Sequence, residues 1–296
     1  MRKRQNSKYS KGASNNKREK FSAGPRIGKS KLKISSEENK ISSKEALNKK
    51  EKAKQKTEAS LTEGMRLNRF IANSGICSRR EADTYIAAGV VKINGEIVTA
   101  LGTKVNTADK VEFEGRIIRS EAKIYVALNK PKSVISAVSS DRGERTVIDI
   151  VRNCCSERLY PVGRLDKNTT GVLLLTNDGD MTKRLTHPSG NIKKLYHASL
   201  DKSFKLEDMQ KLSDGIILED GAVKADEISY IDGNKREVGV QMHSGKNRIV
   251  RRMFESLGYD VKNLDRVLFA GITKKNIPRG KWRFLTPKEV DFLKMK

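Results

Sequence analysis

The first 64 residues contain few apolar side chains, so the folded part of this 296-residue chain must begin after them. Ser, Asn and Lys dominate this segment, and 19 Lys and Arg against 7 Asp and Glu give it a net charge of +12. Such a segment cannot bury enough apolar surface to offset the entropy lost on ordering. We therefore expect residues 1–64 to be a disordered basic extension, either an RNA tether or a solubilising tail.

Positive charge also dominates the rest of the chain. The whole sequence carries +25, which leaves +13 for residues 65–296. This excess predicts a polyanionic partner such as a nucleic acid. The sequence has no run of about 18 apolar residues, and no apolar segment follows its basic start, so we expect neither a transmembrane helix nor a secretory signal. These features predict a cytoplasmic protein that does not bind membranes.

The cysteines and histidines give no indication of a metal site. The cysteines are too few for a disulfide framework and contain no Cys-x-x-Cys pair, so we expect free thiols in a reducing cytoplasm. The histidines lie far apart and lack the spacing of metal ligands, so we expect them to be structural or to face RNA. The residues in question are Cys77, Cys154 and Cys155, and His187, His197 and His243.

Residues 65–119 have the pattern of a small module of two helices and a sheet. The apolar spacing in 67–75 predicts a helix, and Ser78 with Glu81 forms a capping-box pattern that begins a second helix. Asn94-Gly95 then predicts a hairpin, and the alternation in 110–115 predicts another strand. This stretch resembles the S4-type RNA-binding domain. The resemblance implies that Arg66, Arg69, Arg79 and Arg80 contact an RNA backbone.

A second domain, residues 120–296, is expected after a link near Ser120. The apolar runs 124–131, 133–138 and 172–176 read as strands. The segment 163–170 is polar and rich in turn residues, and it stands directly before the last of these strands. Polar loops at the edge of a core often carry function. From the residues alone, Arg164 and Asp166 in this loop are either ordinary neighbours on the surface or part of a catalytic site.

The longer string from Gly163 to Gly179, GRLDKNTTGVLLLTNDG, resembles the signature loop of ribosomal RNA pseudouridine synthases that carry an S4-type domain (RsuA/RluB-like). The segments 193–200, 243–259 and 261–290 resemble further segments of that family in the expected order. Four departures stand out: Leu195 replaces an acidic residue, His243-Ser244 replaces an acidic lead-in, Lys246 replaces Arg and Ile249 replaces Gln. The resemblance implies an α+β fold, with a mixed, mostly antiparallel sheet and helices packed around it.

The resemblance also implies the reaction and its residues. Uracil is detached from ribose C1′, turned and rejoined through C5, without a cofactor or a metal. Asp166 is the expected catalytic carboxylate, acting by covalent attack or by proton abstraction, and Arg251 is expected to pair with it. Tyr196 is expected to stack on the uracil and assist deprotonation, and Arg164 to fill the place of the extruded nucleotide. The remaining expected residues are phosphate contacts and an apolar wall: Lys246, Arg248 and Arg252, and Phe269 or Leu268.

The predicted function is therefore isomerisation of a uridine in ribosomal RNA, most closely resembling the large-subunit (23S) branch. The partner would be ribosomal RNA or a pre-ribosomal particle, and the enzyme would act as a monomer. The alternatives are a small-subunit (16S) enzyme and a non-catalytic RNA-binding or ribosome-assembly factor. Retention of Asp166 favours an enzyme, because a pure RNA binder has no need of a carboxylate facing phosphates.

Overall fold

The computed structural model describes residues 64–296, and residues 63–296 form one unit by themselves. The disorder expected for residues 1–64 therefore concerns residues outside the described range, apart from Gly64. None of the helices within the described range is long and apolar enough to span a membrane.

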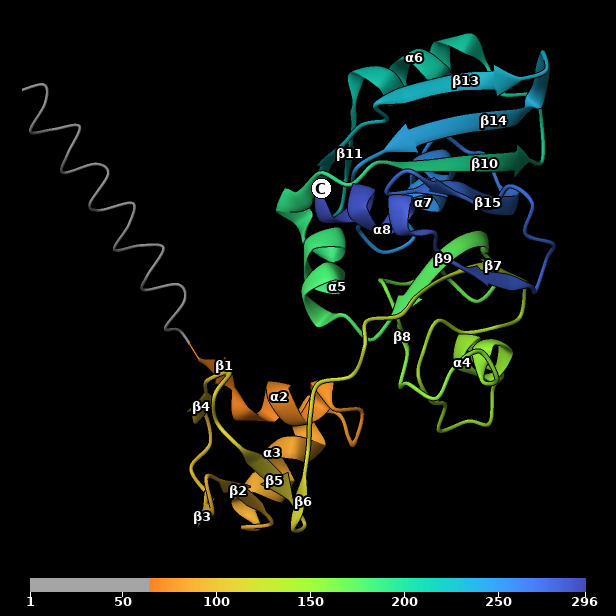
Figure 1. The fold of residues 1–296 in the computed structure, drawn as a ribbon. Coiled ribbons are helices and arrows are strands. Elements are labelled where there is room, and N and C mark those ends of the chain that lie inside the picture. Colours follow the sequence, from red (N-terminus) through yellow and green to blue (C-terminus); the bar gives the residue numbers. More distant parts are fainter. Residues whose placement is uncertain (1–63) are drawn as a thin grey trace, which may run out of the picture. The chain divides into compact units, whose positions relative to one another are not determined.

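The first part of this range contains two helices and short strands, as the sequence predicts (Figure 1). A four-stranded sheet has the order β3-β2-β5-β6, and β1 pairs with β4. The elements are β1 (Met65–Arg66), α2 (Leu67–Asn73), α3 (Arg79–Ala87), β2 (Val91–Ile93), β3 (Glu96–Ile97), β4 (Lys104–Val105), β5 (Val111–Phe113) and β6 (Arg116–Ile117).

Local interactions explain where these elements begin and turn. At the start of α3, the Ser78 amide donates to Glu81 Oε2 at 2.6 Å, and the Glu81 amide donates to Ser78 Oγ at 3.3 Å. The predicted capping box is thus confirmed. Asn94 and Gly95, with φ of 52° and 91°, form the tight turn between β2 and β3. Leu67 and Ile71 of α2 pack with the sheet in one apolar core.

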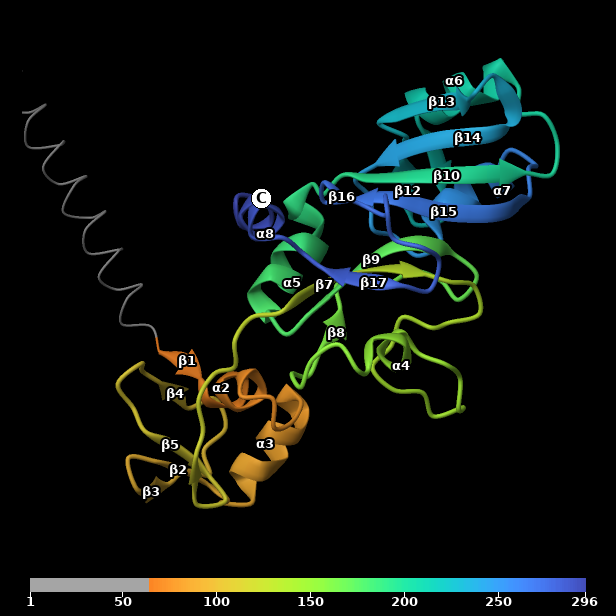
Figure 2. The ribbon, with the colours of Figure 1, turned by 45° about the vertical axis from the view of Figure 1, so that its right-hand side comes forward.

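The second part is built on a nine-stranded sheet (Figures 1 and 2). Its main path is β13-β14-β10-β15-β9-β7-β17, with β16 paired to β15 and β8 to β9. The strands are β7 (Tyr125–Lys130), β8 (Tyr160–Pro161), β9 (Thr170–Thr176), β10 (Lys194–Leu200), β13 (Glu227–Ile231), β14 (Asn234–Met242), β15 (Val261–Phe269), β16 (Ile272–Thr273) and β17 (Trp282–Phe284).

Helices pack around this sheet, and a separate hairpin is formed by β11 (Ile216–Leu218) and β12 (Gly221–Val223). The helices are α4 (Val147–Val151), α5 (Gly179–Thr186), the 3₁₀ turn η1 (Pro188–Gly190), α6 (Leu206–Asp214), α7 (Ile249–Glu255) and α8 (Pro287–Lys294). Figures 1 and 2 show α5 beside α8, and their buried side chains Leu185 and Leu293 belong to one apolar cluster. The expected α+β class, with a mixed and mostly antiparallel sheet, is confirmed.

Strand β9 is buried on both faces, which explains its uninterrupted apolar sequence. Val172 and Leu174 pack into the cluster that contains α5 and α8. Leu173 and Leu175 point the other way, into a cluster with Val147 of α4. The strand therefore lies at the centre of this part of the fold.

The pairing of β9 with β15 is the parallel one in this sheet, and it joins two antiparallel groups of strands. Gly171 lies opposite Arg266 in this pair and has a φ of +109°. A Cβ at Gly171 would lie 2.1 Å from the Arg266 carbonyl oxygen and 2.5 Å from its amide nitrogen. Only a glycine permits this approach of the two backbones.

Residues 133–138 do not form the strand that their apolar pattern predicts. The segment makes one isolated bridge, between Ile135 and Thr146, and Ser133 has a φ of +62°. Val134 is buried, so the apolar pattern reflects packing of a loop. The polar Ser136 within it is used as a hydrogen-bonding group, because its hydroxyl accepts from the Leu165 amide at 3.1 Å.

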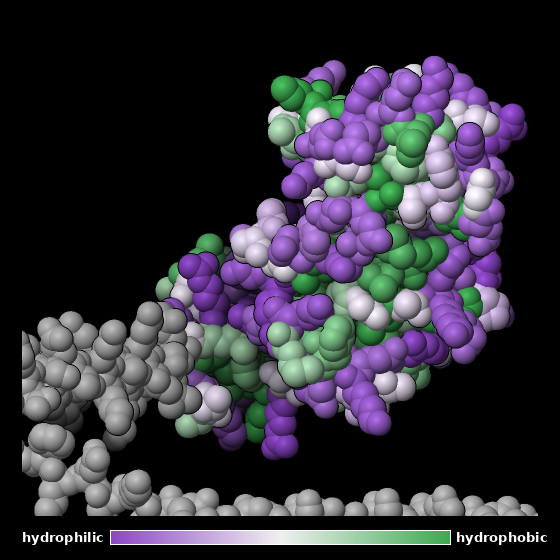
Figure 3. All heavy atoms as spheres, turned by 90° about the horizontal axis from the view of Figure 1, so that it is seen from above, coloured by the Kyte–Doolittle hydropathy of each residue, from purple (hydrophilic) through white to green (hydrophobic). Residues whose placement is uncertain are grey.

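The face of the molecule seen in Figure 3 is mainly hydrophilic. Figure 3 shows polar side chains over most of the visible face, with apolar side chains in smaller separate patches. Scattered apolar groups of this kind are normal on a folded protein.

We expect Gly171→Ala to destabilise the protein by about 3 kcal/mol or more, because the methyl group would clash with the Arg266 backbone in a strained conformation. Gly233→Ala is the matched control. Gly233 also has a positive φ, +73°, but no atom lies within 4 Å of an added Cβ. We expect that change to cost about 1 kcal/mol. Denaturant unfolding measures both, and equal losses would contradict a special role for the Gly171 approach.

Candidate functional site

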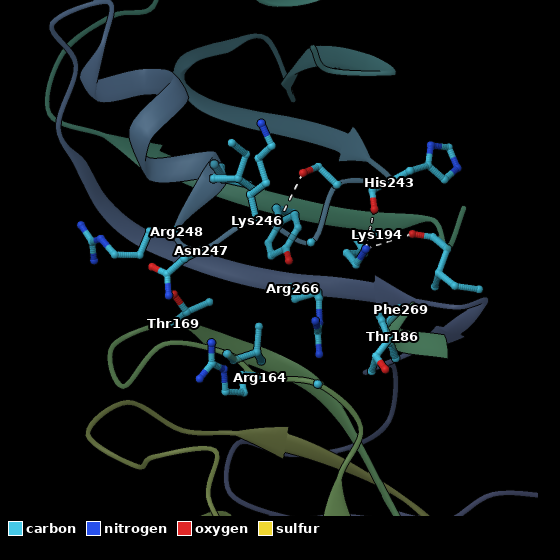
Figure 4. A pocket seen from close by; sticks show the side chains of 18 of the residues that line it. Arg164, Thr169, Thr186, Lys194, His243, Lys246, Asn247, Arg248, Arg266 and Phe269 are labelled. Carbon is cyan, nitrogen blue, oxygen red and sulfur yellow. Dashed lines mark hydrogen bonds between the residues drawn. The ribbon is translucent and has the colours of Figure 1, made fainter. Parts of the chain in front are cut away.

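A cavity of about 680 Å³ lies between the loop that precedes β9 and the face formed by β10 and β15. Its lining includes Asp166, Tyr196 and Arg266. Figure 4 shows Arg164 on one side of this pocket and Lys246 on the other, with Arg266 extending between them. The cavity thus collects polar side chains that are as far apart in the sequence as Arg164 and Arg266.

Strand register brings these residues together. On β15, Arg266 is the partner of Gly171 on β9 and of Tyr196 on β10. Asp166 precedes Gly171 by five residues, at the end of the loop that leads into β9. Tyr196 and Arg266 therefore project from neighbouring strands next to the loop that carries Asp166.

Two side chains from the β7 region hold the backbone of that loop. The buried Lys130 Nζ donates to the carbonyl oxygens of Asp166, Lys167 and Thr169 at 2.9–3.1 Å, and to its neighbour Pro131 at 3.2 Å. The Ser136 hydroxyl donates to the Leu165 carbonyl at 2.9 Å. Burial lowers the pKa of Lys130 to about 8, and the Asp166 carboxylate partly offsets this. The ammonium replaces water for carbonyls that would otherwise lack donors.

The half-buried Asp166 carboxylate forms no hydrogen bond or ion pair with any residue in the range 64–296. The expected ion pair with Arg251 is therefore absent from the described structure. Arg251 Nη1 donates instead to the Val261 carbonyl at 2.6 Å. Burial and Arg248 lower the pKa of Arg251, whereas the charge of Asp166 favours its protonated form from a distance. The role of Arg251 in chemistry stays a prediction.

Positive charge dominates the lining of the cavity. Asp166 is its carboxylate, whereas five Lys and Arg side chains surround the space: Arg164, Lys194, Lys246, Arg248 and Arg266. A concave site of this sign attracts an anionic ligand and concentrates it near the carboxylate.

Lys194 and Arg266 lie inside the cavity, and burial affects both. Lys194 Nζ donates to the His243 carbonyl at 2.6 Å and to the Ile192 carbonyl at 3.3 Å. Burial, followed by the neighbouring Arg266, lowers the pKa of Lys194 to about 8. Burial also lowers the pKa of Arg266, which the adjacent Tyr196 partly offsets.

The cations predicted to contact phosphates form a rim and have carboxylate partners. Lys246 and Arg248 line the cavity, and Arg252 lies outside the lining but shares Asp220 with Lys246. Lys246 donates to the Asp220 carbonyl at 2.6 Å, and Arg252 donates to the Asp220 carboxylate at 2.6 Å. Arg248 pairs with Glu255 at 3.2 Å. Arg251 also lies outside the cavity lining. Partly exposed ion pairs are weak, so phosphates can replace these carboxylates.

The four arginines predicted to bind RNA lie in the first part of the described structure. Arg66, Arg79 and Arg80 are exposed and form no ion pair within residues 64–296. Arg69 is paired with Asp180 of α5. Three of the four thus present uncompensated charge on the described surface.

Some of the residues expected near the site face the cavity, and two residues of the site were not predicted from the sequence. Phe269 lines the cavity as an apolar wall, whereas Leu268 does not. Ile249, the departure from the family pattern, is buried among apolar side chains at the start of α7. Lys130 and Arg266 were not predicted as site residues. For Lys130, the available signal was a cation at the end of a mostly apolar strand. Strand β15 has other polar residues around Arg266, so its sequence gives no such signal.

The histidines take part in local contacts. His243 Nδ1 lies 2.6 Å from Asp226, and His187 Nδ1 lies 2.7 Å from the Ser189 hydroxyl. His197 contacts Glu237 on the neighbouring strand β14. Among residues 64–296 no group of three His, Cys, Asp or Glu side chains is arranged to hold a metal ion.

Comparison with protein families finds two matches. Residues 124–256 match the RNA pseudouridylate synthase family, and residues 65–111 match the S4 domain. A crystal structure of a pseudouridylate synthase superposes with a TM-score of 0.56 at 28% identity, covering 78% of this chain and 100% of that chain.

Curated relatives agree with these matches. The chain is 40% identical to the ribosomal large subunit pseudouridine synthase B of Bacillus subtilis, covering 77% of this chain and 95% of the relative. It is 36% identical to the dual-specificity RNA pseudouridine synthase RluF of Escherichia coli, covering 78% and 79%. It is also 36% identical to an uncharacterized RNA pseudouridine synthase of Aquifex aeolicus, covering 76% and 92%.

We expect Lys130→Met to lower turnover by about 100-fold or more, because the loop that carries Asp166 loses the ammonium that binds three of its carbonyls. Each carbonyl left without a donor also costs about 1–3 kcal/mol before relaxation, so the variant should unfold more readily. Lys132→Met is the control, since Lys132 is exposed and lies two residues along. Activity assays and thermal unfolding test both, and equal behaviour of the two variants would refute this role of Lys130.

Proposed function

Because this chain belongs to the RNA pseudouridine synthase family and carries an S4 domain, we propose that it isomerises a specific uridine of large-subunit ribosomal RNA to pseudouridine at the cavity described above. In this reaction the C1′–N1 bond breaks and a C1′–C5 bond forms. The proton on C5 is lost and N1 gains one, so the atoms of the nucleotide are unchanged. The reaction consumes no second substrate.

The meeting of Asp166 and Tyr196 in one positively charged cavity is the observation that carries this proposal. A carboxylate beside C1′ is needed to open the glycosidic bond. A tyrosine ring can stack on uracil, and its hydroxyl can assist removal of the C5 proton. Asp166 forms no ion pair within the described residues, so its oxygens are available to a substrate. The surrounding cations suit a phosphodiester chain.

We assign the other residues by their place around the cavity. Arg164 is exposed on the loop beside Asp166, in a position to fill the space left by an extruded nucleotide. Lys246, Arg248 and Arg252 at the rim would bind phosphates in exchange for their present carboxylate partners. Arg251 would act on Asp166 through its charge.

The large-subunit target rests on resemblance to the Bacillus subtilis relative, which is named for that subunit. The Escherichia coli relative has dual specificity, so a second RNA target is an alternative within the same chemistry. We propose that the substrate is ribosomal RNA or a pre-ribosomal particle, and that the enzyme acts on it as a monomer in the cytoplasm. Mapping pseudouridines in ribosomal RNA from cells that lack the protein identifies the target.

We expect Asp166→Asn to lower pseudouridine formation by at least about 10³-fold while leaving RNA affinity within a few-fold, because the carboxylate acts on C1′ and contributes little to binding. Asp141→Asn, at an exposed position of a loop, is the control. Single-turnover rates at saturating enzyme give the chemical step, and a binding titration gives the affinity. Substantial turnover by Asp166→Asn would favour a non-catalytic role for this carboxylate.

We expect the double variant Arg79→Gln, Arg80→Gln to bind RNA more weakly and with a shallower dependence on salt. Binding releases counterions at each phosphate contact, so a variant with two fewer contacts releases fewer of them. The slope of log affinity against log salt should fall by about 1.5 for the two contacts. Arg116→Gln is the control, since Arg116 is an exposed arginine of the same small domain on β6. An unchanged slope in the double variant would mean that these arginines do not meet the RNA backbone.

A further inference from the structure

Arg266 is a buried cation inside the cavity. Its side chain is 2% exposed, although the cavity that it lines is open to an RNA substrate. Its position on β15 is paired with Tyr196 on β10, and Figure 4 shows the Arg266 side chain within the pocket. Charged side chains are rarely buried to this degree unless they are paired, so Arg266 is expected to have a partner.

Within the described structure, only some of the donors of Arg266 have a partner. Arg266 Nε donates to the Val172 carbonyl at 2.9 Å, and the guanidinium lies 4.4 Å from the centre of the Phe269 ring. These two contacts fix its plane and position, and the adjacent Tyr196 side chain favours its charged form. Its Nη2 atom is buried and has no hydrogen-bond partner among residues 64–296, and Arg266 forms no ion pair there. A buried donor left without an acceptor is costly, so a ligand that supplies one is favoured.

The other cations of the cavity are engaged or exposed. Lys194 gives its ammonium to the His243 carbonyl, Lys246 to Asp220, and Arg248 pairs with Glu255. Arg164 stands exposed on its loop. Within the described lining, Arg266 thus combines a fixed position, exclusion from water and an unused donor.

The chemistry of the proposed reaction creates the acceptor that Arg266 lacks. When the C1′–N1 bond breaks, its electron pair stays on the uracil, and the negative charge spreads from N1 onto the carbonyl oxygens. The detached ring must be held in this state until C5 faces C1′. A donor that is fixed in advance and shielded from water stabilises such a charge most strongly.

We propose that Arg266 is a catalytic residue that donates from Nη2 to a carbonyl oxygen of the uracil and stabilises the detached, negatively charged ring. Arg266 remains protonated throughout and exchanges no proton with the substrate. The C1′–N1 electron pair goes to the uracil, and the pair that forms the C1′–C5 bond comes from it. This inference rests on the proposed function, because it needs uracil in the cavity beside Asp166.

The test replaces one uracil oxygen at a time. RNA substrates carry uridine, 2-thiouridine or 4-thiouridine at the target position, because sulfur is a weaker hydrogen-bond acceptor than oxygen. Single-turnover rates at saturating enzyme are compared for the wild-type protein and for Arg266→Met. For each protein we take the ratio of the rate with the oxygen substrate to the rate with the sulfur substrate. The intrinsic effect of sulfur is the same in both ratios, so it cancels when the two proteins are compared.

We expect the wild-type ratio to exceed that of Arg266→Met by about tenfold at one of the two positions, because only the wild-type protein loses a charge-assisted hydrogen bond there. Arg266→Met should also react at least about 100-fold more slowly with uridine itself. Equal ratios in the two proteins at both positions would overturn the proposal, even if Arg266→Met is slow.

Two further variants separate chemistry from folding. Arg279→Met removes an arginine that pairs with Asp265, the neighbour of Arg266 on β15, and it does not line the cavity. It should lower the melting temperature but keep the wild-type ratios. Arg266→Lys keeps a cation but loses the planar pair of donors, so its ratio at the contacted oxygen should move toward that of Arg266→Met. If Arg266→Met does not fold, the ratio measured for Arg266→Lys tests the proposal instead. Wild-type turnover of uridine establishes the proposed function separately.

Discussion

Thr170 and Gly171 of β9 pair in parallel with Asp265 and Arg266 of β15, and the two antiparallel groups of strands meet at this short junction. The junction requires the close backbone approach that Gly171 permits. The loop that carries Asp166 enters the sheet here, Arg266 belongs to the junction itself, and Tyr196 lies opposite Arg266 on the neighbouring strand β10. The position of the cavity is therefore a consequence of how the sheet is joined.

The same region holds one fully buried lysine, Lys130, and one partly buried lysine, Lys194. Lys130 and Lys194 direct their ammonium groups to backbone carbonyls, which satisfy their donors without a full opposite charge. Carbonyl dipoles stabilise a buried ammonium less than water does, and the pKa of each falls to about 8. Such contacts fix a loop and a strand end in one geometry, which a reaction that turns a base within its site requires.

The sequence predicted elements whose signal is local. The Ser78–Glu81 capping box, the Asn94-Gly95 turn and the buried strand β9 depend on neighbouring residues, and the structure contains all three. The segment 133–138 was misjudged, because apolar residues in a packed loop and in a strand look alike in one sequence.

The candidate site was predictable where a motif carried it, as for Asp166 and Tyr196, but long-range geometry was not. The pairing of Arg251 with Asp166 followed from resemblance, yet the Arg251 guanidinium binds the Val261 carbonyl in the described structure. The role of Arg266 depends on strand register and on the Phe269 ring beneath it. Neither contact leaves a mark in the spacing of residues along the chain.

The cations around the cavity divide into two groups with different physical properties. Those at the rim, such as Lys246 and Arg252, are partly exposed and share the carboxylate of Asp220, a contact that is screened by salt and readily exchanged. Those inside, Lys194 and Arg266, are shielded and held by fixed contacts. On the proposed assignment, binding of the RNA chain should depend on salt through the rim, whereas the chemical step should depend on donors that salt does not reach. This separation would allow one cavity to accept a flexible polyanion and still hold a single base rigidly.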